Sequence, residues 1–418
     1  MSKWKIYTPD GVQDILYEEC HLKRILEQKL RSIFRSCGYS EIETPTIEFY
    51  DVFSSDEGSM PQENMFKFFD QQGRILVLRP DITIPVARIT ATKCRDAAYP
   101  LRFSYIGNVF RYNDFGGGKQ NEFTQAGIEV LGVSTPESDA EVISIAINAL
   151  KATGLESFQV DIGQVEFFKG LMEETGLCEE DTSKVCMLID RKDYVGLEEF
   201  LNSCDIRKNL KKLIFDLPGF FGSTDVIDRV EALNINKRSR DALENIRQVL
   251  KILDDYGQGQ YVSVDLGMLR GLDYDTGIIF RGFTHGVGFP ILTGGRYDRL
   301  VGEFGKDCPA TGFSLGINLI MMALQRQSMA IEKPETDSIV CYTDKGRKTA
   351  FELCDELRRQ GLVVELDIAN RSPEAAGIYA AEKNIGGVIS IVDEDTVEIY
   401  YVQSGEVAKV QISELLKR

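Results

Sequence analysis

The chain has 418 residues, of which 43% are hydrophobic and 27% charged, and this balance indicates a globular protein of two or three domains. The net charge of −17 does not suit a protein that mainly binds nucleic-acid phosphates, and it favours a protein partner. No apolar run approaches the roughly 20 residues of a membrane span, and the first residues do not resemble a secretion signal. We therefore expect a cytoplasmic protein that does not bind a membrane.

The nine cysteines and two histidines limit the chemistry of the protein. The cysteines are scattered, odd in number and never spaced as Cys-x-x-Cys, which predicts free thiols in a reducing compartment. Neither His21 nor His285 has a second candidate ligand near it in the sequence. We therefore expect no metal site, no Ser-His-Asp triad and no cofactor.

Hydrophobic periodicity predicts the first elements of the chain. Apolar residues recur at helical spacing over Leu22–Phe34, and Gly38 marks the end of this amphipathic helix. Arg74–Leu78 alternates as a strand. Two longer strands are predicted at Leu101–Arg111 and Glu122–Leu131.

The pattern then changes to helices with a few strands. Ser138–Glu141 is predicted to be a capping box, and the helix after it ends at Gly154. From about residue 167 to residue 255 the sequence is helical and charged, without strands, which predicts an inserted helical subdomain. Gly312–Leu324 is predicted to be an apolar buried helix. Further strands are expected at Ser157–Ile162, Tyr261–Leu266 and Thr276–Phe280.

A boundary near Pro334 separates a core domain, residues 1–330, from a C-terminal domain, residues 335–418. Strands and helices alternate in the second domain, at Ser338–Tyr342, Lys348–Gln360, Val363–Asp367, Glu374–Lys383 and Gly387–Ile391. This alternation predicts a small α/β domain with a mixed sheet.

Two pairs of polar residues stand out at predicted strands. Asp81 and Thr83 follow a strand and are two residues apart, so they are placed to hold an ammonium group; a solvated turn is the alternative. Gln125 and Glu129 lie four apart on a predicted strand and therefore share a face. Burial of such groups without partners is costly, so this pair predicts either a polar ligand pocket or a buried network.

Two glycine-containing motifs follow. Arg270–Tyr274 (Arg-Gly-Leu-Asp-Tyr) and Gly294–Asp298 (Gly-Gly-Arg-Tyr-Asp) place arginine, aromatic and acidic residues beside glycine. Glycine allows the backbone to approach a ligand closely. Neither motif is specific by itself, and a structural turn is the alternative for the second.

Taken together, the order and spacing of these motifs resemble the histidyl-tRNA synthetase family over almost the whole chain. The resemblance rests on Tyr7–Asp14, Gly38–Glu48 with Pro45, Leu78–Thr83, Phe110-Arg111, Phe123–Glu129, Arg270–Tyr274, Gly295–Asp298 and Gly312–Gly316. It implies an α+β fold, namely a class II aminoacyl-tRNA synthetase-like antiparallel sheet flanked by helices. It also implies dimerisation through the motif that contains Pro45, and a tail that resembles an anticodon-binding domain.

The departures from the synthetase pattern concern ATP. In the synthetases a glutamate two residues after the motif 2 arginine reads the adenine, whereas this chain has Asn113. The motif 2 loop keeps only Lys119 as a cation, and Leu319 stands where motif 3 has an arginine. Cations stabilise phosphate charge during adenylation, and leucine supplies none. We therefore predict that aminoacylation activity is lost and that the chain has no catalytic residues.

The histidine-binding part of the family pattern is better preserved. The resemblance implies that histidine is bound by Asp81, Thr83, Arg111, Gln125, Glu129, Arg270, Tyr274 and Tyr297. Asp81 replaces the usual glutamate. Asp275 stands where the family has a tyrosine, which removes one wall of the imidazole pocket.

Tyr7–Leu16, Leu78–Arg88 and Phe123–Gly132 look closer to the regulatory subunits of short-form ATP phosphoribosyltransferase than to true synthetases. This resemblance implies a non-catalytic subunit, dimeric within a hetero-octamer, that activates the short catalytic subunit and transmits feedback inhibition by L-histidine in histidine biosynthesis. One alternative is a divergent histidine–tRNA ligase, which needs phosphate-binding cations where Asn121 and Leu319 stand. Another is a different synthetase paralogue. Acidic residues outnumber basic ones over residues 335–418, which argues against tRNA binding.

Overall fold

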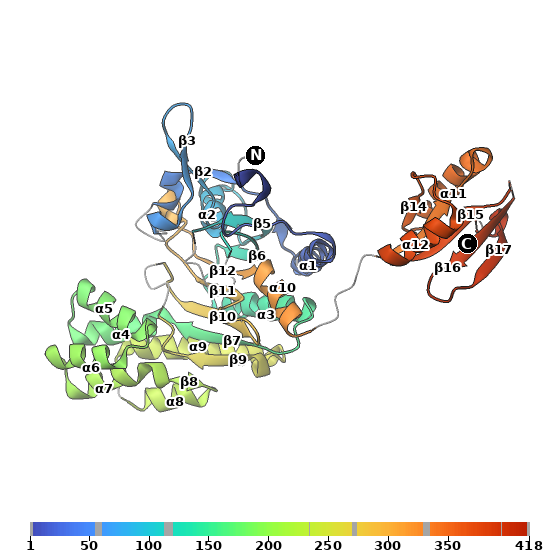
Figure 1. Ribbon diagram of the computed structural model, residues 1–418. Helices are drawn as coiled ribbons and strands as arrows, with labels where there is room; N and C mark the ends of the chain where they lie inside the picture. The colour runs from blue at the N-terminus through green and yellow to red at the C-terminus, as the bar shows by residue number, and fades with distance from the viewer. Residues whose placement is uncertain are drawn as a thin grey trace. The chain divides into compact units, whose positions relative to one another are not determined.

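The computed structural model describes residues 3–54, 61–112, 120–233, 235–269, 274–328, 335–393 and 395–415. The chain forms two compact units, Met1–Ala330 and Ile331–Arg418 (Figure 1). Two segments used in the sequence analysis lie outside the described residues, namely 270–273, which includes Arg270, and the motif 2 loop 113–119, which includes Asn113 and Lys119.

A nine-stranded sheet forms the centre of the first unit, in the order β1-β5-β6-β12-β11-β10-β7-β9-β8. Its strands are antiparallel except for the β1–β5 and β7–β9 pairs. The strands are β1 Ser40–Glu41, β5 Leu101–Phe110, β6 Glu122–Leu131, β7 Phe158–Gln164, β8 Phe221–Gly222, β9 Val262–Asp265, β10 Ile278–Thr284, β11 Leu292–Arg296 and β12 Ala310–Gly316. The strands β5 and β6 lie where they were predicted, and they pair with each other in an antiparallel manner.

Helices pack against this sheet, so the fold is the α+β arrangement that was expected. They include α1 Tyr17–Ser36, α3 Pro136–Ala152, α9 Lys237–Asp255 and α10 Ile317–Arg326. The apolar stripe of α1 is buried through Leu22, Leu26, Leu30 and Phe34. Gly38 has a φ of +84°, a conformation that only glycine adopts readily, so the stop predicted after this helix is correct.

Two predicted elements differ from the structure. Residues 310–316 are not helical; they form β12, which is paired on both sides, and α10 begins only at Ile317. A short apolar run fits a buried strand as well as a buried helix, and the pairing with β6 and β11 decides the outcome. The capping box of α3 joins Thr135 and Ser138, rather than Ser138 and Glu141, because Pro136 occupies the first helical turn.

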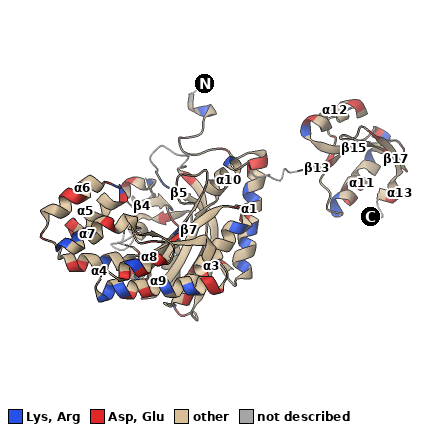
Figure 2. Ribbon diagram, turned by 90° about the horizontal axis from the view of Figure 1, so that it is seen from below, with Lys and Arg blue, Asp and Glu red and all other residues tan. Residues whose placement is uncertain are grey.

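The inserted segment is largely helical. Its helices are α4 Val165–Thr175, α5 Glu179–Asp190, α6 Tyr194–Ser203, α7 Lys208–Asp216, α8 Asp225–Glu231 and α9. The prediction of a segment without strands was wrong at β8, whose two residues pair with β9 at the edge of the central sheet. Figure 2 shows that acidic and basic residues alternate along the ribbons of these helices.

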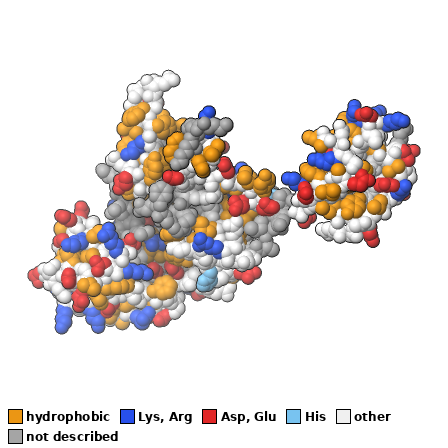
Figure 3. Space-filling model, in the orientation of Figure 1, with side chains coloured by type: hydrophobic (Ala, Val, Ile, Leu, Met, Phe, Trp, Pro, Cys, Tyr) orange, Lys and Arg blue, Asp and Glu red, His pale blue; other side chains and the backbone are white. Residues whose placement is uncertain are grey.

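A second, smaller sheet has the order β2-β4-β3 and lies beside α2 Thr83–Thr92. Its strands are β2 Ile47–Phe49, β3 Lys67–Phe69 and β4 Ile75–Leu78. Val77 of β4 is buried with Phe53, Val86 and Tyr105 in one cluster, which links this sheet to α2 and to β5. Phe49, Phe69 and Ile75 remain exposed, and Figure 3 shows hydrophobic side chains on this part of the surface.

The second unit has a five-stranded sheet in the order β14-β13-β15-β16-β17. Its elements are β13 Thr336–Cys341, α11 Arg347–Arg359, β14 Val364–Leu366, α12 Pro373–Lys383, β15 Ile385–Ile391, β16 Thr396–Tyr401, β17 Val407–Gln411 and α13 Ile412–Leu415. Two neighbouring strand pairs, β14–β13 and β13–β15, are parallel, and two, β15–β16 and β16–β17, are antiparallel, so the sheet is mixed, as expected. The β16–β17 hairpin was not predicted.

Short 3₁₀ helices connect many of these elements. They span Lys3–Ile6, Tyr50–Phe53, Gln62–Asn64, Leu217–Gly219, Gly259–Tyr261, Gly302–Phe304 and Asp344–Gly346. Within the described ranges, no helix combines the length and the apolar character needed to cross a bilayer.

Candidate functional site

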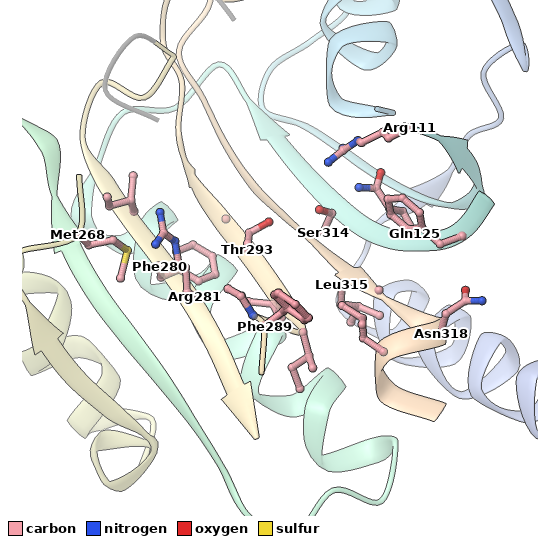
Figure 4. Close-up of a pocket in the computed structure, with 18 of the residues that line it drawn as sticks. Arg111, Gln125, Met268, Phe280, Arg281, Phe289, Thr293, Ser314, Leu315 and Asn318 are labelled. Atoms are coloured by element: carbon pink, nitrogen blue, oxygen red, sulfur yellow. The ribbon is translucent and has the colours of Figure 1, made fainter. Parts of the chain in front are cut away.

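Two adjoining cavities lie over the central sheet. The smaller has a volume of about 260 Å³ and is lined by Asp81, Thr83, Glu129, Tyr274, Asp275 and Tyr297, among others. The larger has a volume of about 460 Å³, and its lining includes Arg111, Gln125, Phe123, Arg281 and Leu319 (Figure 4). Asp275, Thr293, Gly294 and Ser314 line both cavities, so the two form one site.

Glu129 is the centre of the smaller cavity. Its side chain accepts hydrogen bonds from Thr83 Oγ1 at 2.8 Å, from Tyr105 Oη at 3.1 Å and from Tyr297 Oη. Burial raises the pKa of Glu129 to about 8, although the hydrogen bonds from Tyr297, Thr83 and Tyr105 oppose this shift. The carboxyl group is therefore poised to ionise when a cation enters.

Asp81 and Arg111 form the edge of the site. Arg111 Nη2 lies 3.3 Å from Asp81 Oδ2, and Arg111 Nε donates to the carbonyl oxygen of Pro80. Asp81 Oδ1 also accepts from the backbone N–H of Ile84, which fixes the start of α2. The guanidinium carbon of Arg111 is 5.6 Å from the centre of the Phe123 ring. Arg111 is thus held in place by a carboxylate, a carbonyl and a ring.

Gln125 is a buried polar side chain in the larger cavity, with 5% of its surface exposed. Among the described residues, no group lies within hydrogen-bonding distance of its Oε1 atom. Figure 4 places the Gln125 amide close to Arg111 at the end of this cavity. A buried amide oxygen without a partner is costly, so Gln125 is a natural acceptor for a ligand N–H group.

The smaller cavity exists because two glycines face it. Gly295 of β11 and Gly312 of β12 are directly opposed, and Gly312 is opposed to Glu129 of β6. A Cβ atom at Gly312 would lie 1.6 Å from Glu129 Oε2, and one at Gly295 would lie 2.9 Å from Asp275 Oδ1. The two glycines therefore form a floor between the carboxylates of Glu129 and Asp275.

Two tyrosines form an aromatic wall. The rings of Tyr274 and Tyr297 are stacked with their centres 5.4 Å apart. Tyr297 is buried with its hydroxyl group on Glu129, as described above. Of the eight residues predicted to bind histidine, the structure brings together seven around the joined cavities, and Arg270 lies outside the described residues.

Arg296 belongs to a glycine motif that was considered for ligand binding, but its side chain points away from the site. Its guanidinium group contacts Asp139 Oδ1 at 2.8 Å and Ser138 Oγ at 2.8 Å, both on α3. It also contacts Asp298 Oδ1 at 3.0 Å. The structural alternative therefore holds for Arg296, which attaches β11 to α3, while Tyr297 beside it faces the cavity.

The larger cavity has few groups suited to phosphate. Leu319 of α10 lines it, and Asn318 beside it accepts from the backbone N–H of Thr124 at 2.9 Å and donates to Gln120 Oε1 at 2.6 Å. Asn318 is thus committed to structural hydrogen bonds. Among the described lining residues, the cations are Arg111, which is paired with Asp81, and Arg281. This lining offers little charge to neutralise a triphosphate.

Metal chemistry has no candidate within the described residues, because no three His, Cys, Asp or Glu side chains are close enough to hold an ion. The nine cysteines are free.

Replacing Gly312 with alanine is expected to close the smaller cavity. The new Cβ atom would overlap Glu129 Oε2 and would lie 2.5 Å from the backbone oxygen of Ile128, which has little room to move. We expect a loss of about 1–3 kcal/mol in the free energy of unfolding, measured by urea denaturation. Gly219→Ala is the control, because no described atom lies within 4 Å of its added Cβ atom. Equal stability of the two variants would contradict the packing argument.

Comparisons with known proteins identify the family of the chain. The family model for histidyl-tRNA synthetase matches residues 11–320. The chain is 65% identical over 417 residues to the ATP phosphoribosyltransferase regulatory subunit of Acetivibrio thermocellus, covering 100% of both chains. It is 56% identical to that of Ruminiclostridium cellulolyticum, covering 100% of this chain and 99% of the relative.

A solved structure with a similar fold belongs to the same family. It is described as an ATP phosphoribosyltransferase regulatory subunit/histidyl-tRNA synthetase from Bacillus halodurans. It matches this chain with a TM-score of 0.83 and 32% identity, over 93% of this chain and 98% of that one. The sequence and fold relationships together show that the chain belongs to the family of ATP phosphoribosyltransferase regulatory subunits, which share the histidyl-tRNA synthetase fold.

Proposed function

We propose that this chain is a non-catalytic regulatory subunit that activates a short ATP phosphoribosyltransferase catalytic subunit and transmits feedback inhibition by L-histidine in the first step of histidine biosynthesis. The observation that carries this proposal is the pair of joined cavities. The smaller has Asp81, Thr83 and Tyr297 around Glu129, whereas Leu319 lines the larger, at the position where the synthetase resemblance places an arginine for phosphate. A protein that binds an amino acid but lacks the groups needed to react it with ATP is suited to sensing the concentration of that amino acid.

The acidic lining of the smaller cavity suits the positively charged ammonium group of histidine. The ammonium group would lie between Asp81, Thr83 and Glu129, which supply two carboxylates and a hydroxyl group. The ring would lie beside the stacked pair of Tyr274 and Tyr297. Gln125, Arg111 and Arg270 would then contact the remaining polar groups of the ligand, as the family resemblance implies.

Regulation requires two conformations that the catalytic subunit and histidine stabilise to different extents. The site is suited to such coupling, because its residues belong to both sheets of the first unit. Asp81 follows β4 of the small sheet, whereas Glu129 and Asp275 lie on or beside the central sheet. A ligand that draws these residues together changes how the two sheets contact each other.

We further propose that the chain is dimeric within a hetero-octamer, without tRNA as a partner. The exposed apolar residues of the small sheet support a protein contact there, because Phe69 is 71% exposed and lies close to the exposed Ile75, with which it is paired. The resemblance to class II synthetases assigns dimerisation to the neighbouring motif with Pro45.

Reconstitution with a short-form catalytic subunit tests the proposal. We expect this chain to raise the rate of phosphoribosyl-ATP formation, and we expect L-histidine to reverse the activation by about 5- to 150-fold, the usual range of allosteric coupling. Without the partner, we expect no histidine-dependent exchange between pyrophosphate and ATP. The measurements are the absorbance of phosphoribosyl-ATP and radioactive pyrophosphate exchange.

A matched variant makes the test sharper. Glu129→Gln removes the charge of the proposed ammonium site and leaves the apolar surface of the small sheet unchanged. It should therefore still form the complex and activate, with histidine inhibition weakened. Absence of both complex and activation would reject the regulatory proposal in favour of another synthetase paralogue. Pyrophosphate exchange would instead indicate a divergent histidine–tRNA ligase.

A further inference from the structure

The side chain of Lys169 connects the inserted helical subdomain to the wall of the smaller cavity. Lys169 lies on α4, and its ammonium group donates a hydrogen bond to the backbone oxygen of Asp275 at 3.3 Å. Asp275 and its neighbour Tyr274 both line the smaller cavity. The role of this contact rests on the proposed function, because this cavity is the one proposed to take an amino acid.

The residues after Asp275 are held by backbone contacts. The N–H group of Thr276 donates to the carbonyl oxygen of Arg296 at 2.7 Å, and the carbonyl oxygen of Gly277 accepts from the N–H group of Val165 at 3.1 Å. The carbonyl group of Asp275 is bonded instead to the end of a long, flexible lysine side chain. This carbonyl group can therefore move without breaking the strand pairing of β10.

Lys169 has a second acceptor within reach. Glu166 lies one helical turn before it on α4, and the ammonium group is 3.8 Å from Glu166 Oε1. That distance is too long for a hydrogen bond, so the ammonium group is bonded to Asp275 and only attracted to Glu166. A movement of about 1 Å would shorten this ion pair to the usual length of about 2.7–2.9 Å. The two side chains are 26% and 29% exposed, so water screens the pair only in part.

Glu166 is in turn bound by a residue of α9. Two nitrogens of Arg238 contact Glu166 Oε2, at 2.6 and 2.7 Å, and Arg238 also lies 3.5 Å from Glu173. The two helices are in close contact beside these charges, because a Cβ atom added at Gly170 of α4 would lie 2.4 Å from Ser239 Oγ of α9. Tightly packed elements transmit a displacement to each other, so a change at Glu166 affects both helices.

A ligand in the smaller cavity must touch the segment that Lys169 holds. The cavity has a volume of about 260 Å³, and Tyr274 and Asp275 line it together with Glu129. Burial raises the pKa of Asp275, while the charges of Lys169 and Arg281 oppose this shift. A ligand that displaces this side chain also displaces the carbonyl group of the same residue. Occupancy of the cavity therefore reaches the acceptor of the Lys169 ammonium group.

We propose that Lys169 is a positioning residue that couples the smaller cavity to the inserted helical subdomain. In one state its ammonium group holds the carbonyl oxygen of Asp275, as in this structure. In the other state a bound amino acid displaces that carbonyl group, and the ammonium group pairs with Glu166 and competes with Arg238. The helices α4 and α9 then shift together, which gives the subdomain a surface that depends on the ligand and that a protein partner can sense.

Hydrogen–deuterium exchange of the full chain, with and without L-histidine, tests this coupling. We expect histidine to change the exchange rate of backbone amides in α4 and in the first turns of α9 by at least about 5-fold, the lower end of allosteric coupling. Lys169→Met removes the charge and keeps a long side chain. By calorimetry this variant should bind histidine with an affinity reduced by no more than about 10-fold, the net value of one hydrogen bond. Its exchange response in α9 should be lost.

Two further variants separate coupling from a general loss of packing. Lys169→Arg keeps a cationic donor, so it should restore the response. Lys211→Met is the matched control, because Lys211 of α7 also donates to a backbone oxygen of the subdomain, that of Cys204 at 2.8 Å, and neither residue lines a cavity of the site. Its response to histidine should equal that of the wild type. Where Lys169→Met fails to fold, Glu166→Gln removes the charge that receives the ammonium group, and its response should likewise be lost.

A wild-type chain that binds histidine without a change in α4 and α9 would overturn the coupling, as would a response that persists in Lys169→Met or, in its place, Glu166→Gln. Absence of histidine binding would overturn it too. The proposed regulatory function fails separately, since activation of the catalytic subunit is measured without any amino acid present. Activation without the exchange response would keep the function and reject the coupling, and the response without activation would do the reverse.

Discussion

Arg296→Leu is expected to lower the free energy of unfolding by about 3–5 kcal/mol, the cost of removing one partner of a buried ion pair. Arg296 and Asp139 are 5% and 2% exposed, and two nitrogens of the guanidinium group contact the carboxylate at 3.2 and 2.8 Å. Loss of Arg296 leaves Asp139 buried beside Ser138, and it also removes the donor to the carbonyl oxygen of Val133. Urea denaturation followed by circular dichroism measures the change.

The control for this experiment is Arg207→Leu. Arg207 contacts Glu174 at 2.6 Å, a shorter distance than in the buried pair, but its side chain is 64% exposed. We expect a change of less than about 1 kcal/mol, because water screens exposed pairs. Similar losses in the two variants would show that burial does not determine the strength of these contacts. A stable Arg296→Leu variant would contradict the attachment of β11 to α3.

Glu129→Gln is expected to change both the pH dependence of stability and the binding of histidine. Burial raises the pKa of Glu129 from its ordinary value of about 4.5 to about 8 in the folded chain. Between these values the folded chain holds a proton that the unfolded chain has lost. The contribution of this carboxyl group to stability is therefore fully present below about pH 4.5 and is lost as the pH rises to about 8.

Glutamine does not titrate, so the difference in the free energy of unfolding between the wild type and the Glu129→Gln variant reports the titration of Glu129 alone. The free energy of unfolding of the variant minus that of the wild type should rise by up to about 1.4 kcal/mol per pH unit between pH 5 and pH 8. Urea denaturation at several pH values measures this difference. A difference that does not vary with pH would place the pKa of Glu129 near its usual value.

The affinity for histidine should depend on pH in the opposite direction to the stability of the folded chain. A bound ammonium group favours the ionised carboxylate, so histidine binding releases the proton of Glu129 below pH 8, and this group strengthens binding as the pH rises. Glu129→Gln should weaken histidine binding by about 10- to 100-fold at pH 8, because a charged acceptor is lost. Calorimetry in two buffers with different ionisation enthalpies counts the protons released. Proton release that persists in the variant would assign it to another group.

The sequence by itself determined much of the architecture. Strand periodicity located β5 and β6, and the even spacing of Gln125 and Glu129 placed both on one face, where the structure has them lining the joined cavities. Local patterns succeed here because strand alternation and helical stripes depend on neighbouring residues only. The motif order also identified the family, since each motif is short and its residues are adjacent in the chain.

Long-range packing decided the remaining features. Arg296 and Asp139 are 157 residues apart, so no local pattern distinguishes a structural arginine from a ligand-binding one. The helix predicted over residues 312–324 became a strand in its first part, because β6 and β11 supply backbone partners on both sides. The floor formed by Gly295 and Gly312 depends on strand register, which sets which residues are opposed. Only the tertiary structure fixes that register, and with it the position of Asp275 above the cavity.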